Sequence, residues 1–174
     1  MKYLLSLLVI ASLMILSGCI STVRSKKAPN FTSHLNKINV ILMTSYNTGD
    51  FDPEFSETFQ DLLSTEGIKS EINIIAPSSE EKEQEEIEGL FSVHSDSVLL
   101  ITQSVSVTLY KGYYSDAMES SAGEFIARLH VGDKDNPVWV ARIRAQTGGY
   151  GNIEKVAKLT AKQVFKKLKK DKII

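Results

Sequence analysis

The 174-residue chain contains a single cysteine, Cys19, so no disulfide can form within it and its fold must depend on a hydrophobic core. Long hydrophobic runs are also absent. The apolar stretch at the N-terminus, from Tyr3 to Leu16, is shorter than the roughly twenty residues that cross a bilayer. Neither sign of charge dominates, because 20 Lys and Arg offset 21 Asp and Glu to a net charge of −1. This balance gives no support to nucleic-acid binding.

Sequence motifs of catalysis are missing as well. The three histidines are scattered along the chain, at His34, His94 and His130. None has a metal-binding spacing such as HExxH, and the chain has neither a GxSxG serine motif nor a free thiol for a cysteine nucleophile. Asp50, Asp52 and Glu54 lie close together, but Pro53 among them favours a helix start over a catalytic cluster. We therefore expect no enzyme, no catalytic residue, no metal site and no cofactor.

The first residues have the pattern of an export signal. Lys2 precedes the apolar stretch, and the small residues Ser17 and Gly18 lead into Cys19. Leu16-Ser17-Gly18-Cys19 resembles the lipobox of bacterial lipoproteins. In that family a diacylglyceryl group is added to the cysteine thiol and the signal is cut before it. The resemblance implies that residues 1–18 are a cleaved signal peptide and that Cys19 is lipidated. An ordinary secretory signal or a retained N-terminal membrane helix are the alternatives.

The residue after the cysteine bears on location. Ile20 stands where many Gram-negative lipoproteins that stay at the inner membrane have Asp. By resemblance to that sorting rule, we expect the outer membrane, with the protein facing the periplasm. Two or three acyl chains on Cys19 would anchor it stably.

The mature chain is predicted to have a tether and one domain. Residues 20–33 lack apolar periodicity and contain Ser, Lys and Pro, so residues 19–34 are expected to form a lipidated flexible tether. Residues 35–174 have the size of a single globular domain.

Hydrophobic periodicity predicts eight elements in this domain. Strands are expected at 37–44, 68–76, 98–110, 124–131 and 138–145, and helices from 52, over 79–91 and over 153–170. A GDKDNP turn joins the last two strands into a hairpin, whose core side would carry Phe125, Ala127, Leu129, Trp139, Ala141 and Ile143. The order β-α-β-α-β-β-β-α predicts an α/β (or α+β) fold with a single mixed sheet and helices packed on it.

With the lipobox before it and a Trp-bearing strand before the final helix, this order resembles small periplasmic bacterial lipoproteins. These include the curli-secretion and peptidoglycan-synthase-activator types and related uncharacterised families. Such proteins act mainly by binding or assembling other envelope components. The resemblance implies a non-catalytic role but carries over no functional residue.

Two surfaces are candidates for partner contact. Tyr110, Tyr113 and Tyr114 lie where a strand runs into a loop, and exposed tyrosines are common at recognition surfaces. The alternative is that their rings fold back on the sheet edge. Alternation would also place Arg128, Arg142 and Arg144 together with His130 on the outer side of the hairpin, as a face for an anionic partner. The alternative there is a solvated, salt-bridged sheet face.

The sequence thus predicts a membrane-anchored envelope lipoprotein that acts as a non-catalytic binding or assembly module. Its expected partners are the membrane, through lipid on Cys19, and another envelope protein or cell-wall component. The alternatives are a structural lipoprotein that associates with itself and an enzyme whose site has no recognisable motif.

Overall fold

The computed structural model describes residues 20–43, 51–75, 89, 91, 97–111, 118–132, 136–146 and 153–174. The predicted signal peptide, Cys19, most of the acidic segment 79–91, and Tyr113 and Tyr114 lie outside these residues.

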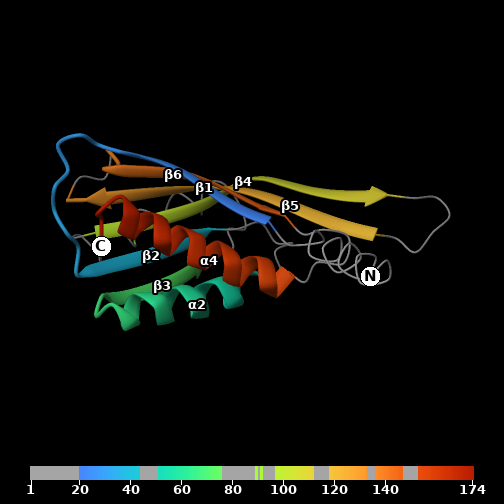
Figure 1. Cartoon of the computed structure of the whole chain (residues 1–174), viewed down its shortest axis with the longest axis horizontal. Coiled ribbons are helices and arrows are strands. Elements are labelled where there is room, and N and C mark those ends of the chain that lie inside the picture. The colour runs from blue at the N-terminus through green and yellow to red at the C-terminus, as the bar shows by residue number, and fades with distance from the viewer. Residues whose placement is uncertain are drawn as a thin grey trace, which may run out of the picture.

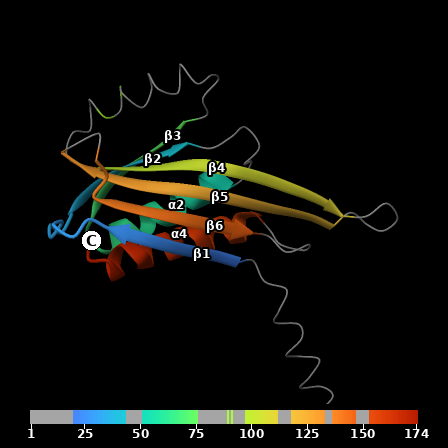
Figure 2. The ribbon, with the colours of Figure 1, turned by 90° about the horizontal axis from the view of Figure 1, so that it is seen from above.

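The described residues form a six-stranded mixed sheet and two long helices (Figures 1 and 2). The strands are β1 (Ile20–Lys27), β2 (Lys37–Met43), β3 (Lys69–Ile75), β4 (Ser97–Lys111), β5 (Met118–Val131) and β6 (Trp139–Gln146), and the helices are α2 (Phe51–Thr65) and α4 (Ile153–Lys170). The spatial order is β1-β6-β5-β4-β2-β3. Strands β3, β2 and β4 run parallel, whereas β4, β5, β6 and β1 pair antiparallel. The predicted fold class, a single mixed sheet with helices on it, is confirmed.

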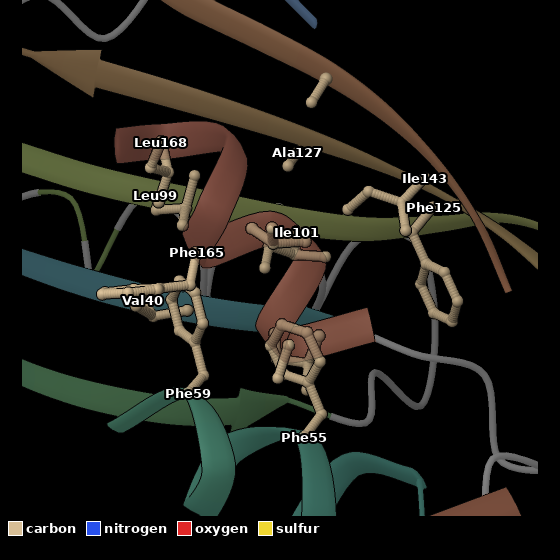
Figure 3. Close-up of a cluster of buried hydrophobic side chains, with 14 of the residues drawn as sticks. Val40, Phe55, Phe59, Leu99, Ile101, Phe125, Ala127, Ile143, Phe165 and Leu168 are labelled. Atoms are coloured by element: carbon tan, nitrogen blue, oxygen red, sulfur yellow. The ribbon is translucent and has the colours of Figure 1, made fainter. Parts of the chain in front are cut away.

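Both helices cover the same face of the sheet, where the main core forms (Figures 1 and 3). Phe55 and Phe59 recur at helical spacing on α2 and are fully buried. From α4, Leu168 packs into the same cluster. The inward residues of the β5–β6 hairpin are all buried, as their alternation predicts: Phe125, Ala127, Leu129, Trp139, Ala141 and Ile143. The prediction of which residues of this hairpin face the core is therefore confirmed.

Helix α2 ends two residues before a glycine. Gly67 has a φ of 75°, a conformation that costs a residue with a Cβ but not glycine. The amide of Ile68 donates a hydrogen bond to the carbonyl oxygen of Leu63 at 3.0 Å, and this closes the last turn and directs the chain into β3.

The opposite face of the sheet carries a second, smaller apolar cluster over β2, β3 and β4. Its members are Ile41, Met43, Ile75, Phe91, Val98 and Leu100. Strand β2 is thus buried on both faces, as its unbroken apolar run predicts. The His130 ring is buried beside this cluster and meets the Phe91 ring edge-on at 5.3 Å.

The predicted tether is wrong over residues 20–27, which form β1. This strand pairs with β6 along its whole length, from Ile20 opposite Gln146 to Lys27 opposite Trp139. The apolar signal is weak because, among the side chains of β1 that point to the helices, Val23 is apolar whereas Ser25 and Lys27 bind polar groups. Residues 20–27 therefore belong to the folded sheet, which the sequence predicts to start only near residue 35.

Candidate functional site

The face of β1, β6 and β5 that points away from the helices carries a group of positive side chains. Arg24, Lys26, Arg128, Arg142 and Arg144 occupy alternate positions on the three strands, opposite in direction to the core residues between them. Among the described side chains of these strands, the one carboxylate is Glu124. Both helices lie on the other face (Figure 1). We call this group of cations, with Glu124, the open face.

Glu124 interacts with both arginines of β6. Its Oε1 lies 3.2 Å from Nε of Arg142, and its Oε2 lies 3.0 Å from Nε of Arg144. The arginine side chains remain 62% and 70% exposed, so most of each guanidinium faces solvent. Exposed ion pairs of this kind contribute only about 0.2–1 kcal/mol. One carboxylate shared by two guanidiniums leaves their remaining N–H donors available to a ligand.

The strand register places like charges directly opposite each other. Arg24 of β1 pairs with Arg142 of β6, and opposed side chains on adjacent strands lie about 5 Å apart at Cβ. Neither Arg24 nor Lys26 has a hydrogen bond or an ion pair with the residues that the structure describes. Like charges in this arrangement destabilise a sheet. An anion bound between the two arginines would relieve that repulsion.

Arg128 lies further across the face and is partly buried. Its Nη1 donates to the Thr102 hydroxyl of β4 at 3.3 Å. Ile126 and Val140 flank it as half-buried apolar residues on the same face. The open face therefore combines positively charged side chains with a small apolar area formed by Ile126 and Val140.

Sequence reasoning found three of these cations, Arg128, Arg142 and Arg144, and the structure brings them together. It does not indicate Arg24 and Lys26, because residues 20–33 lack the apolar periodicity of a strand. Their spacing of two residues is that of one strand face and was the available signal. The fourth predicted member of the face, His130, is buried against Phe91 and is not part of the accessible group.

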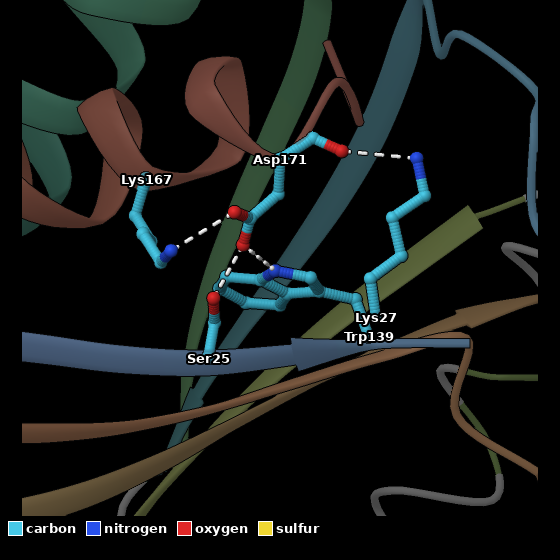
Figure 4. Close-up of polar contacts among 5 residues, drawn as sticks. All are labelled: Ser25, Lys27, Trp139, Lys167 and Asp171. Carbon is cyan, nitrogen blue, oxygen red and sulfur yellow. Dashed lines mark hydrogen bonds and ion pairs between the residues drawn. The ribbon is translucent and has the colours of Figure 1, made fainter. Parts of the chain in front are cut away.

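A polar network fixes β1 to the end of α4 and so holds Arg24 in register (Figure 4). The Asp171 carboxylate accepts hydrogen bonds from the Ser25 hydroxyl, from the indole Nε1 of Trp139 at 2.8 Å and from Nζ of Lys167 at 2.9 Å. The Asp171 carbonyl oxygen accepts a further bond from Nζ of Lys27 at 2.9 Å. The network joins three segments that lie far apart in the sequence.

Charge and burial act in opposite directions on Asp171. Burial raises the pKa of its carboxyl group, but the hydrogen bonds from Ser25, Trp139 and Lys167, with the positive charge of Lys167, outweigh burial and lower the pKa below its ordinary value. The carboxylate is thus charged at neutral pH. Its role is to hold the strand and the helix together.

Two features of the described residues were compared with the requirements of a catalytic or metal site. They contain no group of three or more His, Cys, Asp or Glu placed to hold a metal ion. A hollow of about 300 Å³ beside the end of α2 is lined by Gln60, Ser64, Gly67, Ile68, Lys69 and Ser70, which include no acid and base pair. In the same part of the chain, no helix has the length and apolar character needed to span a membrane.

The remaining predicted site residues are three tyrosines and Cys19. Tyr110 belongs to β4 and stands opposite Glu119 of β5, while Tyr113 and Tyr114 lie outside the described residues. Cys19 also lies outside them, one residue before β1 begins. The lysines of α4 line its exposed side, with Lys158 paired to Glu54 at 3.0 Å and Lys169 to Glu66 at 2.8 Å.

Comparison with known proteins shows the fold alone. No family model and no curated protein matches the sequence. The chain is similar in structure to the PelC dodecamer from Paraburkholderia phytofirmans, with a TM-score of 0.54 and 20% identity over 84% of this chain and 96% of that one. Lipoprotein GNA1162 from Neisseria meningitidis gives a TM-score of 0.44 and 16% identity over 77% and 98% of the two chains. Protein XCC0632 from Xanthomonas campestris gives 0.41 and 13% over 84% and 89%. The chain thus shares its mixed-sheet fold with bacterial PelC.

Proposed function

We propose that this chain is a lipid-anchored, non-catalytic binding module of the bacterial envelope, and that it binds an anionic envelope component on the open face. The observation that carries this proposal is the juxtaposition of Arg24 and Arg142 on a sheet face where Glu124 is the one described carboxylate. Arginine suits such a role because its planar guanidinium binds carboxylate and phosphate groups through paired hydrogen bonds. The expected ligand therefore carries carboxylates or phosphates.

The anchor rests on the lipobox residues, which end at Cys19. Because β1 starts at Ile20, almost no chain separates the lipidated residue from the sheet. The open face would then lie within one domain length of the membrane surface, where anionic polymers and lipid headgroups of the envelope are found. The favoured location is the outer membrane, facing the periplasm.

The test is binding of a soluble polycarboxylate, polygalacturonate, to the mature chain at several salt concentrations. Replacing Arg24, Arg142 and Arg144 by Gln removes three exposed contacts, each worth about 0.5–1 kcal/mol. Affinity should fall roughly 10- to 100-fold, and the salt dependence of the remaining binding should become shallower.

A matched control removes the same charge from α4. Lys162, Lys166 and Lys170 are exposed and make no ion pair with described residues. Their replacement by Gln should leave affinity within about twofold if the open face is the site. Equal losses in the two triple variants would show that net charge alone drives binding, and the proposal would be abandoned.

A second candidate function is self-association, which one exposed edge supports. Strand β3 is an edge strand of the sheet, and its residue Ile74 is 47% exposed. An apolar edge strand is a template for pairing with another chain. The similar Paraburkholderia protein is described as a dodecamer, which is compatible with this alternative. Sedimentation should then show an oligomer that Ile74→Lys converts to a monomer, whereas a monomeric wild type would exclude it.

A further inference from the structure

One side of α4 carries a row of exposed lysines. Lys155, Lys162, Lys166 and Lys170 are separated by seven, four and four residues, which places them on the same side of the helix. The buried residues of α4 lie on its opposite side, toward the sheet. At 1.5 Å per residue the row is about 22 Å long. We call these four residues the lysine row.

The row differs in its surroundings from the lysines that flank it. On the side toward α2, the Nζ of Lys158 lies 3.0 Å from Oε2 of Glu54. Lys162 and Lys166, in the middle of the row, form no ion pair with the residues that the structure describes. Their positive charge is therefore available to an anionic surface outside the domain.

Charge is divided between the two edges of the domain. At one edge β1 and α4 pack together, and they carry ten Lys and Arg with one carboxylate, Glu154 (Figure 2). Toward the other edge α2 packs against β3, and this helix carries four carboxylates with no Lys or Arg. An anionic surface would attract the first edge and repel α2, so it would select the side that the domain turns toward it.

We propose that the lysine row is a membrane contact, which lays α4 along a leaflet of anionic phospholipids beside the lipid on Cys19. The inference rests on the lipid anchor of the proposed function. Strand β1 starts one residue after Cys19, and Ser25 near its other end donates a hydrogen bond to Asp171, just past the end of α4. Strand and helix therefore run in the same direction, and α4 starts at the end of this edge where the lipid lies.

A lipid and a row of cations have complementary effects. The lipid holds the chain at the membrane but does not fix how the domain is turned. A helix of 18 residues is about 27 Å long, so the lipid keeps the whole row near the headgroups at a high effective concentration. With α4 on the membrane, the open face points away from it, because the two lie on opposite sides of the sheet (Figure 1). An anionic partner could then bind there without competition from headgroups.

The test measures how the mature chain binds vesicles without its lipid. Residues 19–174 with Cys19→Ser include every element that the structure describes. Sedimentation with vesicles of phosphatidylethanolamine and phosphatidylglycerol gives the affinity for an anionic surface, and vesicles of phosphatidylcholine give the background for a neutral one. We expect binding to the anionic vesicles that weakens as salt is added, and little binding to the neutral vesicles.

The decisive comparison is between two double variants that lose the same charge. Lys162→Gln with Lys166→Gln removes the middle of the row, whereas Lys37→Gln with Lys69→Gln removes two exposed lysines from β2 and β3. Each lysine near an anionic surface contributes roughly fivefold in affinity, so the first variant should bind about 25-fold more weakly and the second within about twofold of wild type. Both should unfold at the wild-type urea midpoint. Equal losses, or a wild type that does not prefer anionic vesicles, would overturn the proposal.

A label on each helix tests which edge turns toward the membrane. Once Cys19 is replaced, the chain has no other cysteine, so Gln163→Cys on α4 and Gln60→Cys on α2 each carry a single fluorophore. On anionic vesicles with nitroxide-labelled headgroups, the label at position 163 should be quenched more strongly than the label at position 60. Equal quenching, or stronger quenching at position 60, would contradict an orientation set by α4.

Two further measurements separate this inference from the proposed function. Fatty-acid labelling of the wild type shows whether Cys19 carries the anchor, and polygalacturonate binding reports on the open face. The variant without Lys162 and Lys166 should bind the polymer as wild type does. If it also bound anionic vesicles as wild type does, the membrane contact alone would be refuted, whereas polymer binding that survived loss of the open-face arginines would refute the proposed function alone.

Discussion

We expect loss of the Asp171 carboxylate to lower the free energy of unfolding strongly. Asp171→Ala removes the acceptor for three side-chain donors, among them the indole N–H of Trp139, which is fully buried. A buried donor left without an acceptor costs about 1–3 kcal/mol, and hydrogen bonds to a charged group contribute about 1.5–3 kcal/mol each. Since the three bonds share one acceptor, their losses do not add fully, and we expect about 3–5 kcal/mol in total.

That loss is a large share of the roughly 5–15 kcal/mol that stabilises a typical domain. For a chain of this size it corresponds to a fall in melting temperature of about 6–20 °C. Urea unfolding followed by tryptophan fluorescence is a direct assay, because Trp139 is the only tryptophan and belongs to the network. Asp171→Asn, which keeps an acceptor but loses the charge, should fall between the alanine variant and wild type.

The control is an ion pair on the surface. Glu66 meets Lys169 at 2.8 Å, but the two side chains are 40% and 45% exposed, so Glu66→Ala should cost less than about 1 kcal/mol. If Asp171→Ala unfolded at the same urea concentration as Glu66→Ala, the network would have no special part in holding β1 to α4, and the reasoning from burial would be refuted.

Three further outcomes are expected. Because the pKa of Asp171 is lowered in the folded state, its contribution to stability is complete above the unfolded pKa of about 3.9 and is lost as the pH falls through the lower folded pKa. The urea midpoint of the wild type should therefore drop more steeply below pH 4 than that of Asp171→Asn. Gly67→Ala should cost about 1 kcal/mol in thermal unfolding, since alanine is strained at a φ of 75°. Cys19→Ala should abolish incorporation of labelled fatty acid, and equal labelling of mutant and wild type would contradict the lipobox interpretation.

Most of the fold could be predicted because its core elements carry strong periodic signals. Strand β6 alternates buried and outward residues without interruption, so the positions of Trp139 and Arg142 on opposite faces follow directly from the sequence. Helix α4 was predicted with the bounds that the structure shows, because its apolar stripe is long and continuous.

The elements that the sequence did not predict depend on contacts between distant residues. Lys27 reaches the carbonyl oxygen of Asp171 across 144 positions of the chain, and no local pattern encodes such a bond. The open face also depends on contacts between residues that are distant in the sequence. Arg24 and Arg142 come together only through the pairing of β1 with β6, and residues 20–27 lack the apolar pattern that would predict this strand.

The place of β1 in the sheet leads to a final prediction about where the domain begins. A chain that starts at residue 30 lacks β1, and this leaves one edge of β6 unpaired along its whole length. It also removes Ser25 and Lys27 from Asp171. We therefore expect residues 30–174 to unfold at a clearly lower urea concentration than residues 20–174, and to aggregate through the exposed edge.

Coupling between the two ends of the chain provides the sharper measurement. Asp171→Ala should cost less in the shorter chain than in the longer one, because the hydrogen bond from Ser25 is already absent there and only those from Trp139 and Lys167 remain to be lost. A chain from residue 30 that matched the longer one in stability, with an equal cost for Asp171→Ala in both, would mean that β1 detaches freely. The residues after Cys19 would then act as the tether that their composition first indicated.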